Sequence, residues 1–456
     1  MTEEKQLGQK SFDDVRMRGF AQRTSVEAAQ AWVNDHAAPL AGEFVPLQNA
    51  AGRVLAEDVR AGMDVPTFDR SMMDGFALQA EATHGATSFN MLPLLIVGQS
   101  YPGQPFPRQL QHGECIRIMT GAPMPAGANA VLPAEKASTS TENGREILHV
   151  QGDVAVGKHI GPRGEDVRSG ELVLQSGRRL RPQDLGLAAS IGISELCVVK
   201  RPRVRVIVTG NEVQGSGQTH KPQHIFDANG PMLTSLAQRD GAVVQSAGIT
   251  PDDPQAILRA IQEGTSDDSK QSPEPADVIL ISGGSSVGAE DHAARLLAEH
   301  GELAIHGIAM RPSSPSGMGL LPRTDKPASA LVFLLPGNPV SCLCAYDFFA
   351  GRAIRSLGGL PREWPYRKSR HKLTRKLVSQ IGRVDYARVR LLPGDAFAED
   401  QLPSRNDDSP QAIEPLVIGG ASTLSSAVKA DGFVIIPAPS EGYPASATVD
   451  MWRYDE

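Results

Sequence analysis

The stretch DVILISGGSSVGAEDHAARLLAEHG, residues 277–301, joins a continuous apolar run to an amphipathic segment through a glycine-rich loop. Its first part, DVILISGG, has the character of a strand buried on both faces, and HAARLLAEHG has helical spacing. A strand, a glycine turn and a helix in this order form the repeating unit of parallel α/β sheets. The stretch therefore predicts an α/β domain.

The same alternation extends over residues 203–358. Strand-like and helix-like segments alternate in the order VRVIVTG (204–210), PMLTSLAQRDG (231–241), AVVQSAGI (242–249), DPQAILRAIQEG (253–264), DVILISGG (277–284), HAARLLAEHG (292–301), ALVFLLPG (330–337) and a last helix from Pro339. Parallel strands joined in this way need right-handed crossovers. We expect a central, doubly wound, mostly parallel α/β domain at residues 202–360.

The rest of the 456-residue chain predicts a multidomain protein of the α/β plus β class. Residues 24–36 start a helix, with Thr24 and Glu27 at capping-box spacing. Residues 1–50 and 151–201 are expected to form an elongated N-terminal domain with helical segments. Short apolar runs between turn residues predict an inserted β-rich domain at 51–150 and a C-terminal β-barrel, or alternatively a sandwich, at 361–456.

Composition excludes several classes of protein. The formal net charge is -7 at pH 7, so the chain lacks the basic field of a nucleic-acid-binding protein. No apolar run approaches the roughly 18–20 residues of a membrane helix, and we expect a cytoplasmic protein without membrane contact. The four cysteines form no CxxC pair, so neither a disulfide framework nor a zinc site is expected.

Two loops that follow predicted strands are candidates for ligand binding. The loop SGGSSVG (282–288) would bring backbone N–H groups and a helix N-terminus to an anion, although a tight turn explains it equally well. The loop LPGNPVS (335–341) is stiffened by prolines, and Asn338 and Pro339 fit the N-cap and first position of a helix. Because both loops leave strands of one sheet, they could outline a single pocket for a phosphate-bearing small molecule.

Acidic residues follow strands at the same edge of the predicted sheet. Glu212, Asp252 and Asp291 each come after a strand, and a divalent cation between them would allow a phosphate to bind nearby. Each could instead be a solvated loop acid. Arg311 ends a further expected strand and could contact a phosphate, or it could be a surface arginine.

Polar residues also occur in the β-rich region. In PTFDRSMMDGFAL (66–78), Asp74 lies among apolar side chains, RIMTGAPMPAGA (117–128) places Thr120 after a β run, and GPRGED (161–166) ends in Asp166. Turns and caps explain each of these segments when it is taken alone. No G-x-S-x-G nucleophile elbow is present, which argues against a serine hydrolase.

Taken together, these segments resemble the MoeA family, the molybdenum-insertion enzymes of molybdenum cofactor synthesis, to which the E domain of gephyrin also belongs. FDRSMMDGFAL is similar to the family's FDNSAMDGYA element. The segments CIRIMTGAPMPAGANAV, RGED, VTGNEV, SGGSSVG followed by Asp291, and LPGNPVS match in the same order. The resemblance covers nearly the whole chain.

The resemblance implies an elongated homodimer whose α/β domain binds molybdopterin. It also implies a reaction in which adenylylated molybdopterin is bound, its phosphoanhydride is hydrolysed with release of AMP, and molybdate is inserted into the dithiolene. The site would lie between the α/β domain of one subunit and the second domain of the other. Implied partners are the small-molecule substrates, Mg2+, a molybdopterin adenylyltransferase and apo-molybdoenzymes.

Residue roles follow from the resemblance by position. Functional residues would be Asp74, Thr120, Asp166, Glu212, Asp252, Asp291 and Arg311, with Glu212, Asp252 and Asp291 as metal ligands. Phosphate and pterin would be held by Gly283, Gly284, Ser285, Ser286, Gly288, Ser314, Pro336, Gly337, Asn338 and Pro339. Asp74 would reach across the dimer, while Met72, Met73 and Phe76 would anchor its loop in a core.

One departure from the family bears on activity. The common Pro-Gly-Lys-Pro appears here as Pro312, Ser313, Ser314 and Pro315, so a lysine is absent. Either Arg311, at a position where lysine is usual, compensates, or turnover is weakened. A molybdopterin-binding scaffold or carrier is therefore the first alternative. Another enzyme on the same α/β domain, such as a molybdopterin adenylyltransferase or a nucleotide amidohydrolase, is the second, and the matching second domain argues against it.

Overall fold

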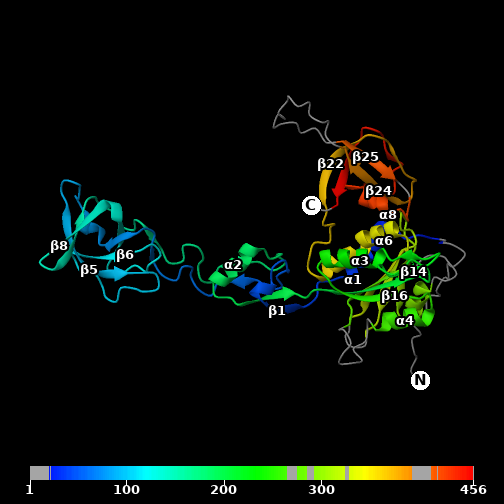
Figure 1. The fold of residues 1–456 in the computed structure, drawn as a ribbon, viewed down its shortest axis with the longest axis horizontal. Coiled ribbons are helices and arrows are strands. Elements are labelled where there is room, and N and C mark those ends of the chain that lie inside the picture. Colours follow the sequence, from blue (N-terminus) through cyan, green and yellow to red (C-terminus); the bar gives the residue numbers. More distant parts are fainter. Residues whose placement is uncertain are drawn as a thin grey trace, which may run out of the picture. The chain divides into compact units, whose positions relative to one another are not determined.

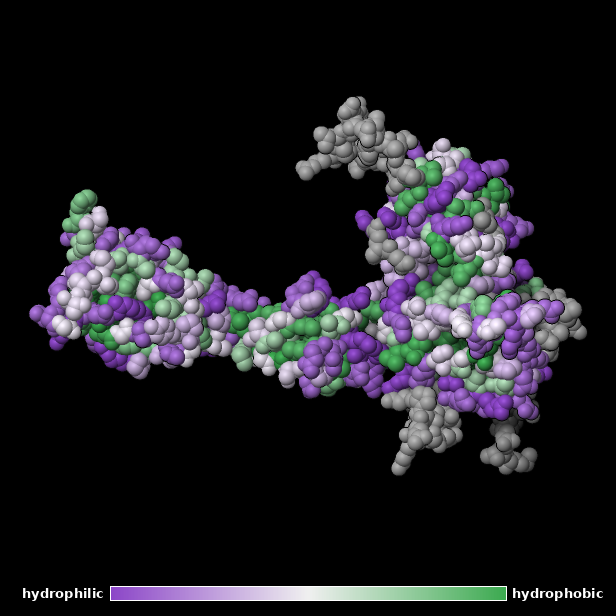
Figure 2. All heavy atoms as spheres, viewed as in Figure 1, coloured by the Kyte–Doolittle hydropathy of each residue, from purple (hydrophilic) through white to green (hydrophobic). Residues whose placement is uncertain are grey.

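The computed structural model describes residue 20 and residues 22–263, 275–284, 292–323, 328–392, 412–417 and 420–454. The chain divides into two compact units, Met1–Gly42 with Val199–Glu456, and Glu43–Val198 (Figure 1). In the view of Figure 2, polar side chains cover much of both units, with apolar side chains scattered between them. Among the helices within the described ranges, none combines the length and apolar character that crossing a membrane requires.

The first unit is built around a six-stranded sheet with the order β16-β13-β17-β21-β20-β18. Its strands are β13 (Arg203–Thr209), β16 (Val243–Thr250), β17 (Val278–Ser282), β18 (Glu302–His306), β20 (Gly317–Leu321) and β21 (Ala330–Leu335). The neighbours β16, β13, β17 and β21 are parallel, which confirms the expected, mostly parallel sheet. The antiparallel edge formed by β20 and β18 was not predicted, because two glycines weaken the strand signal of GMGLL.

Helices cover both faces of this sheet, because successive side chains of a strand point to opposite faces. Val278 and Leu280 join one apolar cluster with α1, α3, α6 and α7, whereas Ile279 and Ile281 join another with α4 and α5. The helices are α1 (Val26–His36), α3 (Asn229–Arg239), α4 (Pro254–Gln262), α5 (Ala293–His300), α6 (Pro339–Ala345), the π-helical turn η4 (Tyr346–Ala350) and α7 (Gly351–Leu357). All four cysteines are free and buried.

Helix α1 packs into the core of the α/β unit and not, as expected, into an elongated N-terminal domain. The reason is its apolar face, which buries Val26, Ala29 and Val33 against that core. The predicted cap at Thr24 is wrong, because Ser25 caps the helix and Thr24 forms a β-bridge to residue 308.

The C-terminal part of the first unit is a closed five-stranded barrel, as expected. Its strands are β22 (Arg367–Leu373), β24 (Val384–Leu391), β25 (Ala412–Val417), β26 (Gly432–Ile436) and β28 (Thr448–Arg453). They follow the order β24-β25-β22-β28-β26, and a pairing between β26 and β24 closes the circle. Shorter elements of this unit are β14 (Val213–Gln214), β15 (Ile225–Phe226), β19 (Met310–Arg311), β23 (Leu377–Val378), β27 (Gly442–Tyr443) and α8 (Leu424–Val428).

The second unit contains a six-stranded sheet with the order β7-β4-β6-β5-β9-β8. These strands are β4 (Gly75–Leu78), β5 (Leu92–Ser100), β6 (Glu114–Ile118), β7 (Ala130–Pro133), β8 (Ala137–Glu142) and β9 (Arg145–Val150). Its other elements are β1 (Gly42–Pro46), β2 (Val59–Arg60), β3 (Arg70–Ser71), β10 (Ile160–Gly161), β11 (Leu172–Leu174), β12 (Glu195–Val199), α2 (Pro182–Ser190) and the 3-10 turns η1 (Leu47–Asn49), η2 (Ala80–Thr83) and η3 (Ala134–Lys136). A separate apolar cluster joins α2 to residues 50–61 and 167–198.

Candidate functional site

A pocket lies where the parallel strands of the α/β sheet end, and we call it the strand-end pocket. It has a volume of about 660 Å³ and is lined by residues that follow β13, β16, β17 and β21. Among them are the predicted site residues Glu212, Asp252, Gly283, Gly284, Pro336, Gly337, Asn338 and Pro339. The two glycine-containing loops thus outline one pocket, as the sequence suggested. Ser285, Ser286, Gly288 and Asp291 lie outside the described residues.

Glycine is required at the base of this pocket. Gly283 has φ +100°, and a Cβ atom there would lie 2.5 Å from the carbonyl oxygen of Thr209. Gly284 has φ +61°, which also favours glycine. The backbone that follows β17 can therefore lie close to β13 and line the pocket without a side chain.

Asn229, which was not predicted as a site residue, connects the two loops. Its side-chain amide donates to Ser282 Oγ at 2.8 Å and to the carbonyl oxygen of Gly337 at 2.8 Å. The Asn229 side chain thereby holds the end of β17 and the 336–339 loop together at the start of α3. The turn residues of DANG (227–230) ahead of the predicted helix were the available signal.

The carboxylates of Glu212 and Asp252 belong to this pocket. Asp252 Oδ2 accepts a hydrogen bond from Asn211 N at 3.0 Å, and Asn211 Oδ1 accepts one from Asp252 N at 3.2 Å, so these bonds tie two strand-end loops together. No Lys, Arg or His of the described ranges forms an ion pair with either carboxylate. Uncompensated carboxylate oxygens are the ligands that Mg2+ prefers, so both residues fit a magnesium site. Within the described residues no cluster of three metal-ligating side chains occurs, and Asp291, the third expected ligand, lies outside them.

Asn338 occupies the N-cap position of α6, and Pro339 is its first residue, as predicted. The Asn338 side chain accepts no hydrogen bond from the backbone of the helix. It lines the strand-end pocket and also a second one.

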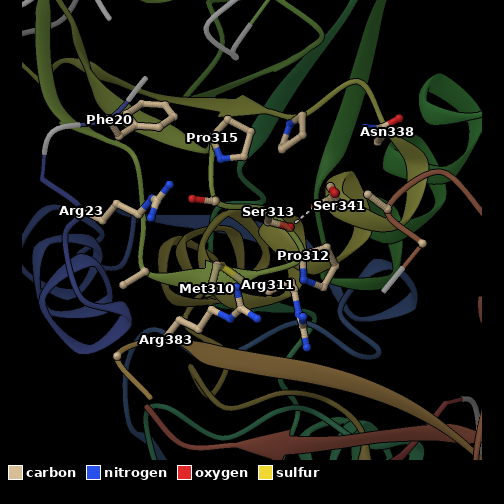
Figure 3. Close-up of a pocket in the computed structure, with 16 residues that line it drawn as sticks. Phe20, Arg23, Met310, Arg311, Pro312, Ser313, Pro315, Asn338, Ser341 and Arg383 are labelled. Atoms are coloured by element: carbon tan, nitrogen blue, oxygen red, sulfur yellow. Dashed lines mark hydrogen bonds between the residues drawn. The ribbon is translucent and has the colours of Figure 1, made fainter. Parts of the chain in front are cut away.

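The second pocket, which we call the arginine pocket, has a volume of about 560 Å³ (Figure 3). Three arginines, Arg23, Arg311 and Arg383, line it together with Ser313 and Ser314. It shares Pro315, Pro336 and Asn338 with the strand-end pocket, so the two cavities adjoin.

Arg311 ends a strand, β19, as expected, but this strand does not belong to the α/β sheet. It pairs with the barrel strand β24. Arg311 Nη2 is 2.6 Å from Oδ2 of the fully buried Asp385, and Arg383 Nε is 3.2 Å from Oδ1 of the same carboxylate. Asp385 therefore neutralises part of the charge of both arginines. Arg383 was not predicted as a site residue, since an arginine at the start of a predicted strand carries no specific signal.

Ser313 and Ser314 form a distinctive loop in the arginine pocket. Ser313 has φ +89°, in the left-handed region that residues other than glycine rarely adopt, and its hydroxyl donates to the carbonyl oxygen of Ser341. Ser314, predicted to hold phosphate or pterin, lines this pocket and not the strand-end pocket. Its Oγ atom is buried and has no hydrogen-bond partner.

Asp74 and Thr120 are brought together in the β-rich sheet of the second unit. Thr120 donates to Asp74 Oδ1 from its backbone nitrogen at 2.7 Å and from its hydroxyl at 2.9 Å. These two bonds lower the pKa of the Asp74 carboxyl below its ordinary value, so the exposed side chain is ionised at neutral pH. Asp166 is exposed in a separate loop, where its backbone nitrogen donates to the carbonyl oxygen of Val65 at 3.0 Å.

The expected anchoring of the Asp74 loop is only partly correct. Phe76 is buried, but Met72 and Met73 are 45% and 36% exposed. The reason is that only Phe76 lies in β4, whereas the methionines precede the strand. The hydroxyl of Ser71 holds the loop instead, by donating to the carbonyl oxygen of Met73 at 2.5 Å.

Comparisons with known proteins agree with this architecture. Residues 24–192 match the family described as "MoeA N-terminal region (domain I and II)", and residues 205–356 match "Probable molybdopterin binding domain". Over 355 residues the chain is 37% identical to molybdopterin molybdenumtransferase 2 of Mycobacterium tuberculosis, which covers 76% of this chain and 82% of the relative. The chain belongs to the molybdopterin molybdenumtransferase family.

Further members of the molybdopterin molybdenumtransferase family extend this agreement. The enzyme of Haemophilus influenzae is 29% identical, over 91% of this chain and 94% of its own. The crystal structure of a molybdopterin biosynthesis MoeA protein from Pyrococcus horikoshii superposes with a TM-score of 0.76 at 29% identity, covering 95% of this chain and 100% of that chain. The chain is thus a member of a transferase family of molybdenum cofactor biosynthesis. Apart from Ser422, the residues that line the strand-end pocket lie in the part that matches the molybdopterin-binding description.

Proposed function

We propose that the protein binds adenylylated molybdopterin in the strand-end pocket, hydrolyses its phosphoanhydride with release of AMP, and inserts molybdate to give molybdenum cofactor. The observation that carries this proposal is the adjacency of two chemically different cavities. The strand-end pocket has a glycine-rich floor and two carboxylates, whereas the arginine pocket is lined by guanidinium groups. A phosphorylated substrate and a separate oxyanion need this combination.

In the strand-end pocket, we assign substrate positioning to the backbone of Gly283, Gly284 and Gly337. Glu212 and Asp252, with Asp291, would hold Mg2+, which when bound neutralises phosphate charge and polarises the phosphoanhydride. Asn229 keeps the two loops at a fixed separation through its two hydrogen bonds. Arg311, Arg383 and Ser314 would receive molybdate in the arginine pocket.

The test follows AMP release and reconstitution of an apo-molybdoenzyme from adenylylated molybdopterin, Mg2+ and molybdate. We expect the wild-type protein to do both. Glu212→Gln and Asp252→Asn should each lower AMP release by on the order of 100-fold, because each removes a charged group that acts on the phosphoanhydride. Glu299→Gln, on the exposed side of α5, is the matched control and should release AMP normally. Normal turnover by the Glu212 and Asp252 variants would exclude the assigned metal site.

A carrier or scaffold is the second candidate, and Ser314 favours it, because the resembling family has a lysine there. In that case the wild-type protein would bind adenylylated molybdopterin but release no AMP. Molybdopterin adenylyltransferase activity would instead appear as ATP-dependent adenylylation of molybdopterin.

Several further predictions rest on the resemblance. They are homodimerisation, a role for Asp74, Thr120 and Asp166 in the reaction, a cytoplasmic location, and contacts with a molybdopterin adenylyltransferase and apo-molybdoenzymes. Light scattering after size-exclusion chromatography tests the dimer. Loss of AMP release in Asp74→Ala, with the thermal stability unchanged, would support the role of the carboxylate that Thr120 holds ionised.

A further inference from the structure

A short N-terminal arm, Phe20 and residues 22–25, is fastened to the rim of the arginine pocket. Thr24 N donates to the carbonyl oxygen of Gly307 at 3.0 Å, and Ala309 N donates to the carbonyl oxygen of Thr24 at 2.8 Å. These two bonds attach the arm as one parallel β-bridge to the segment that leads into β19. The arm is therefore part of the fold at this point.

Phe20 provides a second attachment. Its ring lies edge-on to that of His306, with 4.9 Å between centroids and an interplanar angle of 89°. It also covers Gly307, where a Cβ atom would lie 2.4 Å from Phe20 Cδ1. Gly307 has φ +87°, so glycine both permits the turn and leaves room for the ring. Hydrogen bonds and ring packing thus hold the arm on both sides of Arg23.

Arg23 projects into the arginine pocket from this arm (Figure 3). It differs from the other two arginines of the pocket in its charge balance. Arg311 and Arg383 share the carboxylate of Asp385, whereas Arg23 has no carboxylate partner among the described residues. Arg23 is exposed to solvent. Positive charge is therefore in excess in the pocket, and Arg23 supplies one of the two positive charges that Asp385 leaves unneutralised.

The wall beside these arginines contains a polar atom without a partner. Ser314 Oγ is buried and forms no hydrogen bond, although the backbone oxygen of the same residue accepts one from Ile308 N at 2.8 Å. A buried hydroxyl without a partner is costly unless a ligand or water completes it. The pocket thus combines an uncompensated guanidinium with an unused hydroxyl, and a small tetrahedral oxyanion would satisfy both.

We propose that Arg23 is an oxyanion-binding residue of the molybdate site, delivered to it by the N-terminal arm. This inference rests on the proposed function for the nature of the anion. The planar guanidinium can donate two parallel hydrogen bonds to two oxygens of one oxyanion. Ion pairs with Asp385 restrain Arg311 and Arg383, whereas the guanidinium group of Arg23 can reorient toward the anion. The arm precedes the α/β domain in sequence, and through Arg23 it contributes to the substrate site of that domain.

The experiment measures binding of sodium molybdate to the full-length protein by isothermal titration calorimetry. We expect Arg23→Ala to weaken binding about tenfold or more, since a charged hydrogen bond is lost, and Arg23→Lys to weaken it less. Arg259→Ala, an exposed charge on α4, removes the same charge elsewhere and should leave the affinity unchanged. Melting temperatures of all variants show whether the arm stays folded.

A rescue variant separates ligand binding from a purely structural role. Ser314→Lys places a cation in the same pocket from another wall, so Arg23→Ala/Ser314→Lys should recover much of the lost affinity. Under turnover conditions, Arg23→Ala should raise the molybdate concentration needed for half-maximal cofactor formation, with smaller effects on AMP release.

The two proposals fail in different ways. If the wild-type protein releases AMP and inserts molybdate but Arg23→Ala binds molybdate like the Arg259→Ala control, the role of Arg23 is wrong and the proposed function stands. If the wild-type protein neither releases AMP nor binds molybdate, both the proposed function and the role of Arg23 are wrong. Loss of binding without rescue, accompanied by a lower melting temperature, would reduce Arg23 to a structural residue.

Discussion

Ser313, in the arginine pocket, has a strained backbone conformation that its own side chain stabilises. Ser313 keeps φ at +89° while its hydroxyl donates to the carbonyl oxygen of Ser341. A left-handed conformation costs a residue with a Cβ atom of order 1 kcal/mol, and the hydrogen bond returns a similar amount. The side chain therefore stabilises a backbone turn that its own Cβ atom opposes.

Substitutions at Ser313 test this balance. Ser313→Ala keeps the strain and loses the hydrogen bond, so we expect it to lower the free energy of unfolding of the α/β unit by about 1–2 kcal/mol. Ser313→Gly loses the same bond but relieves the strain, so it should stay within about 1 kcal/mol of wild type. Urea unfolding of the three proteins gives the order. An alanine variant as stable as the glycine variant would contradict a left-handed backbone at this position.

At the scale of elements, the π-helical turn η4 between α6 and α7 buries a charged group. Asp347 lies in this turn, fully buried; Tyr366 Oη donates to its Oδ1 at 2.9 Å, and Arg239 Nη2 lies 3.7 Å from the same oxygen. Burial raises the pKa of the Asp347 carboxyl to about 6, and the nearby Arg239 only partly opposes this. The turn thus places a carboxyl that titrates between acidic and neutral pH inside the core.

The stability of the first unit should depend on pH through this carboxyl. Because its pKa is higher in the folded than in the unfolded chain, the folded state binds the proton more tightly, and this stability is lost as pH rises from about 4 to about 6. Relative to Asp347→Asn, the wild-type protein should lose about 1–3 kcal/mol of unfolding free energy over that window. Urea unfolding of both proteins at pH 4, 5, 6 and 7 measures the difference. A difference that does not change with pH would mean that Asp347 is ionised throughout.

At the scale of the whole molecule, one contiguous segment, residues 43–198, forms the second unit. The chain leaves and re-enters the first unit at one place, since Lys200 N donates to the carbonyl oxygen of Ala41 at 3.0 Å. Both units have apolar clusters of their own. This is the arrangement of an inserted domain, in which each part can fold alone.

Excision of the inserted segment tests this independence. A protein in which a short glycine linker joins Gly42 to Val199 should fold with a single cooperative thermal transition and keep molybdate binding, because the arginine pocket belongs entirely to the first unit. Residues 43–198 expressed alone should give the circular dichroism spectrum of a β-rich protein. A core variant of the excised protein, Phe333→Ala, is the negative control and should lose the transition, since Phe333 is buried in the sheet. Unfolding of the first unit on excision would show that its stability depends on the second.

Elements whose signal is local could be predicted from the amino-acid sequence alone. Continuous apolar runs such as VILIS fixed the parallel strands, the glycines at 283 and 284 marked the loop that lines the pocket, and ordered motifs indicated the family. Helix α1 was also foreseen, because helical periodicity needs no distant partner.

Contacts between residues far apart in the chain could be seen only in the folded protein. Arg311 lies in β19, which pairs with the barrel strand β24, and its side chain forms an ion pair with the buried Asp385, 74 residues away in sequence. Arg23 lines a pocket that is formed mainly by residues 309–421, and Asn229 connects two loops through its side-chain hydrogen bonds. Such contacts depend on long-range packing and on where uncompensated charges come to lie, and neither leaves a periodic signal in the chain.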